Sequence, residues 1–174
     1  MRLPMLAVVA LSGVAVGAVP ASAAPAALSA QDSAFVAAAG YGGNFEVAGG
    51  ELAQARGGTA DVKAFGQRMV SDHTKANTRL AALARQNGAS VPDLPDSQQQ
   101  NILKAWSRLN GKEFDCSYVP TEYLDHVATI GVFQDQAAHG SNADLVRFAK
   151  DTLPTLQEHR RMISMSLSEL DCGP

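Results

Sequence analysis

From Asp32 to the end of the chain, apolar residues recur at spacings of three and four, and clusters of Gly and Pro interrupt the pattern. This period is that of an α-helix with one buried face, and strand-like alternation does not occur. The longest uninterrupted stretches form two consecutive pairs, and a Gly-containing turn joins the members of each pair. The sequence therefore predicts an all-α fold, an antiparallel four-helix bundle made of two helical hairpins.

The breaks in the pattern set the expected bounds of each helix. Thr59 is a good N-cap for the second helix, and Asn110-Gly111 favours a left-handed stop after a short helix between the two pairs. The expected helices cover about residues 32–56, 60–87, 96–109, 114–139 and 143–170. We expect one helical domain over residues 31–170, after a leader of residues 24–30 that is rich in Ala and Pro.

The first residues have the order of a secretory signal peptide. Arg2 supplies a positive charge, an apolar run extends from Leu6 to Val19, and the small residues Ala21-Ser22-Ala23 follow. The run is shorter than the ~20 residues that a helix needs to cross a bilayer. We therefore expect a signal peptide over residues 1–23, cleavage near Ala23, a periplasmic or secreted protein, and no stable membrane insertion.

The charge of the chain excludes some classes of partner. The sequence has 14 Lys and Arg and 17 Asp and Glu, and of these only Arg2 falls within residues 1–23. The remaining chain is therefore acidic, and it has no basic cluster. Nucleic acids and anionic membranes are bound through concentrated positive charge, so we expect neither as a partner. The composition leaves any protein partner and the oligomeric state undefined.

The two cysteines are expected to form a disulfide. Cys116 begins the fourth expected helix and Cys172 follows the fifth, at nearly equal distances from the turn that joins these helices. Antiparallel packing brings such positions level, and an exported protein meets an oxidising environment. This use is preferred over a nucleophilic cysteine. The chain also has no nucleophile elbow, phosphate-binding loop or dinucleotide fingerprint, so no reaction is assigned.

Ionisable side chains interrupt the apolar stripes of all four long helices. In a hairpin, residues equally distant from the turn lie level, which applies to Glu46 with His73 and to His126 with His159. Facing side chains in bundle cores build metal sites, and imidazole and carboxylate ligands suit Zn, Cu, Fe or Mn. The sequence thus predicts a site for a single transition-metal ion, with Glu122 as an additional ligand. The predicted ligands are Glu46, His73, Glu122, His126 and His159.

The same pattern fits a buried hydrogen-bond network that sets the helix register without a metal. The protein would then be a non-enzymatic structural protein of the envelope or of a stress response. Each of the three histidines also follows an acid, namely Asp72, Asp125 or Glu158. These acids either support a histidine on the next helix or face solvent. An enzyme using the cluster would need a pocket and an open coordination position, which the sequence does not show.

Several motifs resemble a known bacterial family. They are Met69-Val70-x-Asp72-His73, Leu109-x-Gly111-x-x-Phe114-Asp115-x-x-Tyr118, and Leu153-Pro154-x-Leu156-x-x-His159. With them the chain resembles domain of unknown function family 4142, secreted proteins with a ferritin-like helical bundle. The resemblance implies this architecture and export over most of the mature chain. It does not imply ferroxidase chemistry, because the Glu-x-x-His pairs of di-iron bundles are absent: Val70, Tyr123 and Leu156 precede the histidines by three.

Overall fold

The computed structural model describes residues 27–173 and contains five α-helices in that range, with no β-strand among these residues. The helices are α1 (Ala30–Arg56), α2 (Ala60–Gln86), α3 (Ser97–Trp106), α4 (Gly111–His139) and α5 (Ala143–Glu169). The predicted all-α fold is therefore confirmed. No helix of residues 27–173 is long and apolar enough to cross a membrane. The predicted signal peptide and residues 24–26 of the predicted leader lie outside the described residues.

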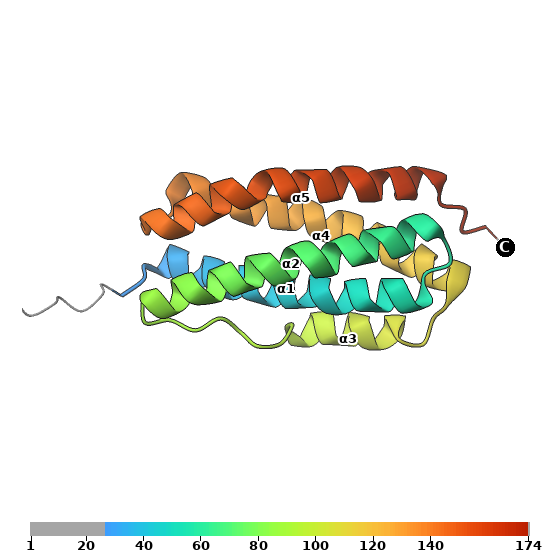
Figure 1. The fold of residues 1–174 in the computed structure, drawn as a ribbon, viewed down its shortest axis with the longest axis horizontal. Helices are drawn as coiled ribbons and strands as arrows, with labels where there is room; N and C mark the ends of the chain where they lie inside the picture. Colours follow the sequence, from blue (N-terminus) through green and yellow to red (C-terminus); the bar gives the residue numbers. More distant parts are fainter. Residues whose placement is uncertain (1–26, 174) are drawn as a thin grey trace, which may run out of the picture.

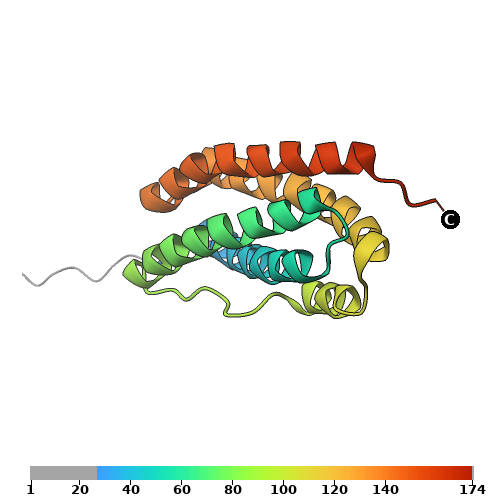
Figure 2. The same ribbon diagram turned by 45° about the vertical axis from the view of Figure 1, so that its right-hand side comes forward.

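The four long helices pack as two antiparallel hairpins. α1 packs on α2 and α4 packs on α5, and the hairpins meet through α1 with α4 and α2 with α5. After α2 the chain returns along the first hairpin before α4 begins, and α3 lies on this crossover (Figure 1). As a result α4 runs opposite to α1 and in the same direction as α2 (Figures 1 and 2). The middles of all four long helices therefore lie at the same height.

Side-chain caps explain where the helices begin. The Thr59 hydroxyl accepts from the Val62 N–H at 3.2 Å, as the sequence predicted for the start of α2. Asp96 and Gln99 form a reciprocal capping box at the start of α3. The Asn142 side chain accepts two backbone N–H groups at the start of α5. These caps satisfy donors that have no partner within the helix, so each break in the pattern becomes a helix start.

Gly111 has a different role from the one its position suggested. α3 ends at Trp106, earlier than expected, and α4 begins at Gly111 rather than near residue 114. Gly111 has a φ of +57°, which favours glycine because it has no Cβ. The left-handed residue was predicted correctly, but it opens α4 instead of closing α3.

Two glycines allow α1 and α2 to approach closely. A Cβ on Gly50 would lie 2.6 Å from the Gly66 carbonyl oxygen, and a Cβ on Gly66 would lie 2.6 Å from that of Gly50. Any side chain at either position would push the helices apart. This close contact lies one turn from Glu46 and sets the spacing between α1 and α2 beside it.

Two hydrophobic clusters fill the ends of the bundle. At the α4–α5 turn the larger side chains are Phe35, Leu80, Phe133, Leu145, Phe148 and Leu156. At the α1–α2 turn they are Phe45, Phe65, Met69, Trp106, Phe114, Tyr118 and Ile163, with α3 as a cover. Buried polar residues from all four long helices lie between these clusters. The apolar core is thus interrupted at mid-height.

Each hairpin also holds the turn of the other hairpin through an aspartate. Asp32 at the start of α1 reaches the α4–α5 turn, and Asp115 near the start of α4 reaches the α1–α2 turn. The donors are the N–H groups of Ser141 and Asn142 for Asp32, both at 3.1 Å, and of Gly58 and Thr59 for Asp115, at 2.9 and 3.0 Å. These charge-assisted bonds fix the height of one hairpin relative to the other.

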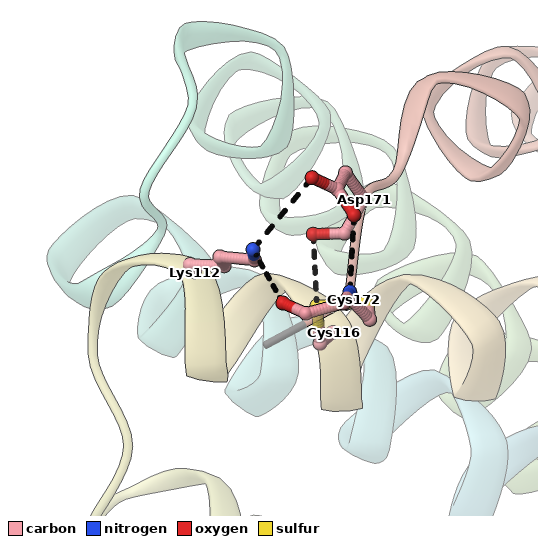
Figure 3. Close-up of a disulfide and its surroundings, with 5 residues drawn as sticks. Lys112, Cys116, Asp171 and Cys172 are labelled. Carbon is pink, nitrogen blue, oxygen red and sulfur yellow. Dashed lines mark hydrogen bonds and ion pairs between the residues drawn. A yellow bond between two sulfur atoms is a disulfide. The ribbon is translucent and has the colours of Figure 1, made fainter.

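The predicted disulfide is present. Cys116 of α4 is bonded to Cys172, which follows the end of α5, and their Cα atoms are 5.8 Å apart. Figure 3 shows the terminal segment lying over α4, where Lys112 donates to the Gly173 carbonyl oxygen at 2.8 Å and lies beside Asp171. The bond joins the last residues of the chain to the beginning of α4.

Candidate metal centre

The five residues that the sequence singled out lie together in one buried layer, called here the His/Glu layer. None is more than 7% exposed, and all four long helices contribute. They form two groups that share His126. One group is His73, His126 and His159, and the other is Glu46, Glu122 and His126. In each group the atoms that could bind a metal lie within 4.8 Å of one another.

The three imidazole rings come from three different helices and converge. The ring centroids are 5.4 Å apart for His73 and His159, 5.5 Å for His126 and His159, and 6.1 Å for His73 and His126. The rings are tilted or edge-on to each other rather than stacked. A single ion at the centre of this triangle would be within reach of all three side chains.

Hydrogen bonds of two rings determine which nitrogen is free, although His126 Nδ1 also faces the carboxylates, 3.6 Å from Glu46 Oε1 and 3.7 Å from Glu122 Oε2. His126 Nδ1 lies 2.9 Å from the Glu122 backbone oxygen, so Nδ1 carries the proton and Nε2 keeps its lone pair. His159 Nε2 lies 3.1 Å from Asp72 Oδ2, so this nitrogen donates and Nδ1 keeps its lone pair. Metal-binding histidines are commonly oriented by such a second hydrogen bond.

The free atoms of the His/Glu layer have no hydrogen-bond partner. They are His73 Nε2, His126 Nε2, His159 Nδ1, Glu46 Oε2, and Glu122 Oε1 and Oε2. Buried polar atoms are almost always paired, because an unpaired one costs about 1–3 kcal/mol. Six unpaired atoms in one layer, all of them nitrogen or carboxylate oxygen, are the donor types that a transition-metal ion binds.

Burial keeps the histidines neutral. Burial, and then the neighbouring His159 and His126, lower the pKa of His73 well below its ordinary value. Burial lowers the pKa of His159 to about 4, although its hydrogen bond to Asp72 acts in the opposite direction. Burial also lowers the pKa of His126. Neutral imidazole is the form that binds metals, so at neutral pH no proton has to leave these rings.

The pKa values of the Glu46 and Glu122 carboxyl groups are raised, whereas those of the histidines are lowered. Burial, and then the nearby Glu122, raise the pKa of Glu46 well above its ordinary value. Burial raises the pKa of Glu122 to about 8. Two carboxylates close together in an apolar environment cannot both carry a charge without a compensating cation. The raised pKa values thus favour the protonated, neutral form of the pair.

Comparison with known proteins identifies the domain type. The model of the family described as Domain of unknown function (DUF4142) matches residues 17–165. The chain belongs to this family. No curated protein and no solved structure matches the chain. The resemblance seen in the sequence is confirmed for the family, and the ferritin-like detail of its bundle stays a prediction.

The acids that precede the histidines behave differently from one another in this DUF4142 domain. Asp72 on α2 bonds to His159 on α5, and it is also paired with Arg68. Although burial raises the pKa of Asp72, these hydrogen bonds lower it overall. Asp125 accepts from Thr129 on its own helix, and Glu158 pairs with Arg161 at the surface. Of the three acids only Asp72 contacts a histidine of the layer.

Two further residues of the DUF4142 domain shape the layer, and the helical pattern did not indicate them. The Tyr118 hydroxyl is buried without a partner, and burial followed by Glu122 raises the pKa of Tyr118. A Cβ on Gly49 would lie 3.1 Å from Trp106 and 3.3 Å from Glu122 Oε1. Gly49 therefore leaves the space that Glu122 occupies. Two adjacent glycines inside a helix were the available signal, because glycine lowers helix stability.

Proposed function

We propose that this protein binds one transition-metal ion through His73, His126 and His159, with carboxylate ligands from Glu46 and Glu122. The six unpaired nitrogen and oxygen atoms of the His/Glu layer carry the proposal. A hydrogen-bond network built to hold the helices would pair its own donors and acceptors. In this layer one nitrogen of each histidine has no partner, and the Glu46 and Glu122 carboxyl groups lie within hydrogen-bonding reach of each other, which is an arrangement expected of ligands.

The nitrogen and oxygen atoms of these ligands favour one class of metal ion. Three neutral imidazoles with carboxylate oxygen suit Zn²⁺, Cu²⁺, Fe²⁺ or Mn²⁺, whereas Ca²⁺ and Mg²⁺ prefer sites made of oxygen alone. Loss of protons from the Glu46 and Glu122 pair would balance the charge of a divalent ion. Asp72 would orient His159 from outside. No reaction is proposed.

We further propose that the protein acts in the periplasm or outside the cell. The disulfide between Cys116 and Cys172 is compatible with an oxidising compartment. The sequence of residues 1–23 has the order of a signal peptide. Mass spectrometry of the mature protein from the exporting cell would test the proposed cleavage near Ala23.

Metal analysis tests the main proposal. Protein purified without chelator should contain close to one metal ion per chain by elemental analysis. After chelator treatment, addition of Zn²⁺, Cu²⁺, Fe²⁺ or Mn²⁺ should raise the melting temperature, because a ligand that binds only the folded state stabilises it. Metal content far below one per chain, together with an unchanged melting temperature, would contradict the proposal.

The chain offers a matched control for the ligand assignment. His126→Leu removes the side chain shared by both groups and should abolish metal binding. His139→Leu makes the same substitution on the same helix, at an exposed residue that pairs with Asp135, and should leave metal binding unchanged. Equal effects of the two substitutions would show that binding is not located in the His/Glu layer.

A further inference from the structure

The His/Glu layer is packed tightly on one side and hollow on the other. Towards the α1–α2 turn, the Phe65 ring lies 5.9 Å from that of His126 and 6.4 Å from that of His159. Towards the α4–α5 turn lies a cavity of about 50 Å³. Glu46, His73 and His159 line this cavity, and His126 and Glu122 do not. A metal held by the layer would therefore be covered on one side only.

The size of the cavity limits what it can hold. One water needs roughly 10–15 Å³, and a cavity that binds benzene has about 150 Å³. The cavity therefore has room for a ligand of a few non-hydrogen atoms and not for an aromatic ring. Its wall combines apolar side chains with hydroxyl groups that can orient a polar guest. These residues include Leu80, Phe133, Phe148, Leu156, Thr129 and Thr152.

The α1 residues on the side of the cavity between α1 and α4 have small side chains. Ala38 there is exposed and Gly42 is partly exposed, and both line the cavity. Among the described residues, no atom of another element lies within 4 Å of the position that a Cβ on Gly42 would take. Between α2 and α5, in contrast, Asp72 is held in place by its bonds to Arg68 and His159. Gly42 therefore leaves open space on the α1 side of the cavity.

We propose that this cavity is the binding pocket for a small exogenous ligand of the metal. The ligand is a molecule or anion of two or three non-hydrogen atoms with an oxygen or nitrogen donor. It enters between α1 and α4 beside Gly42 and reaches the metal from the side of Glu46, His73 and His159. This inference rests on the proposed metal binding. Three histidine ligands and two carboxylate ligands that each bind through one oxygen leave the sixth position of a six-coordinate ion for such a molecule.

Azide binding to the Cu²⁺-loaded mature protein tests the pocket. Azide has three non-hydrogen atoms, and its binding to copper should produce a new, saturable charge-transfer absorption band. Imidazole is a five-membered ring and should produce no spectral change at concentrations that leave the copper content unchanged. Copper content is measured first in every sample, so that metal uptake and ligand binding are scored separately.

Two glycine substitutions locate the route. Gly42→Leu should weaken or slow azide binding by about tenfold or more, with unchanged copper content, because the new side chain occupies the mouth of the cavity. Gly131→Leu is the matched control, since this α4 glycine is exposed, does not line the cavity, and also has open space at its Cβ position. Both changes replace a helical glycine with a good helix former, so neither should impair folding.

The outcomes separate the two proposals. Failure to take up copper would overturn both metal binding and the pocket. Copper uptake without an azide band would overturn the pocket and leave metal binding standing. Equal azide binding by the Gly42→Leu and Gly131→Leu proteins, or binding of imidazole as tight as that of azide, would overturn the cavity as the route.

Discussion

The ends and the middle of the bundle bury polar groups in opposite ways. Asp32 and Asp115 at the ends are 1% and 2% exposed, which is as little as Glu46 at 2%. Each end aspartate accepts backbone N–H groups from the turn of the other hairpin. Glu46 and its neighbours at mid-height instead leave six atoms unpaired. The exposed fractions of these side chains are similar in the two regions, whereas the satisfaction of their hydrogen bonds differs.

The pKa values show the same contrast. Burial raises the pKa of Asp32, but hydrogen bonds from Ser29, Gln136 and the α4–α5 turn outweigh it and lower the pKa overall. Burial raises the pKa of Glu46, and its acidic neighbours raise it further. A buried charge that the chain satisfies supports the fold, whereas buried groups that the chain does not satisfy indicate a ligand from outside. The ends support the fold, and the middle contains the groups that the proposed metal would bind.

The largest effect on the free energy of unfolding is expected from removal of the disulfide at one end of the bundle. Cys116→Ser with Cys172→Ser opens a link between residues 56 positions apart. The chain-entropy account expects a loss of about 4 kcal/mol in the free energy of unfolding. Urea unfolding measures it, and metal content should be unchanged because the bond is remote from the His/Glu layer. A loss of metal from the folded double variant would show that the end and the middle are not independent.

Removal of an end aspartate is expected to have the next largest effect. Asp32→Ala leaves buried donors of the α4–α5 turn without an acceptor, which should cost about 3 kcal/mol in denaturant unfolding. Asp135→Ala is the control, because it removes an exposed carboxylate that bonds to Gln31 and His139. Similar losses from the two substitutions would mean that the buried bonds of Asp32 add nothing to the fold.

A smaller effect is expected from acid, since protonation removes the charge of Asp32 but keeps its oxygens. The folded pKa of Asp32 lies below its ordinary value of 3.8. The contribution of its charge is therefore complete above that value and is lost as the pH falls through the folded pKa. The difference in unfolding free energy between wild type and Asp32→Asn should shrink over this acidic range. A difference that stays constant with pH would contradict the role of the charge.

The smallest effect on the free energy of unfolding is expected from substitutions in the His/Glu layer. In metal-free protein, His73→Leu with Glu46→Leu should change the free energy of unfolding by less than about 1 kcal/mol, or increase it, because unpaired polar atoms are replaced by apolar ones. The same double variant should lose the rise in melting temperature on metal addition. A loss of several kcal/mol without metal would instead favour the structural network considered from the sequence.

Much of the fold and of the candidate site follows from periodicity alone. Helix spacing and short turns make the height of a residue depend on its distance from the turn, so Glu46 was placed level with His73, and Cys116 with Cys172. In the structure Glu46 and His73 line the same cavity, and Cys116 is bonded to Cys172. The predicted start of α4 was a few residues too late, because α4 begins at Gly111 and the φ of that glycine depends on the chain around it.

The sequence by itself determined the helices, the two hairpins, the disulfide and the composition of the His/Glu layer, because each follows from local spacing. Only the tertiary structure decided how the hairpins meet. The crossover through α3 sets the direction of α4, and Asp32 and Asp115 set its height through bonds between residues far apart in the chain. The free nitrogen of His159, its hydrogen bond to Asp72 of another helix and the cavity beside Gly42 depend on that packing, which local periodicity does not encode.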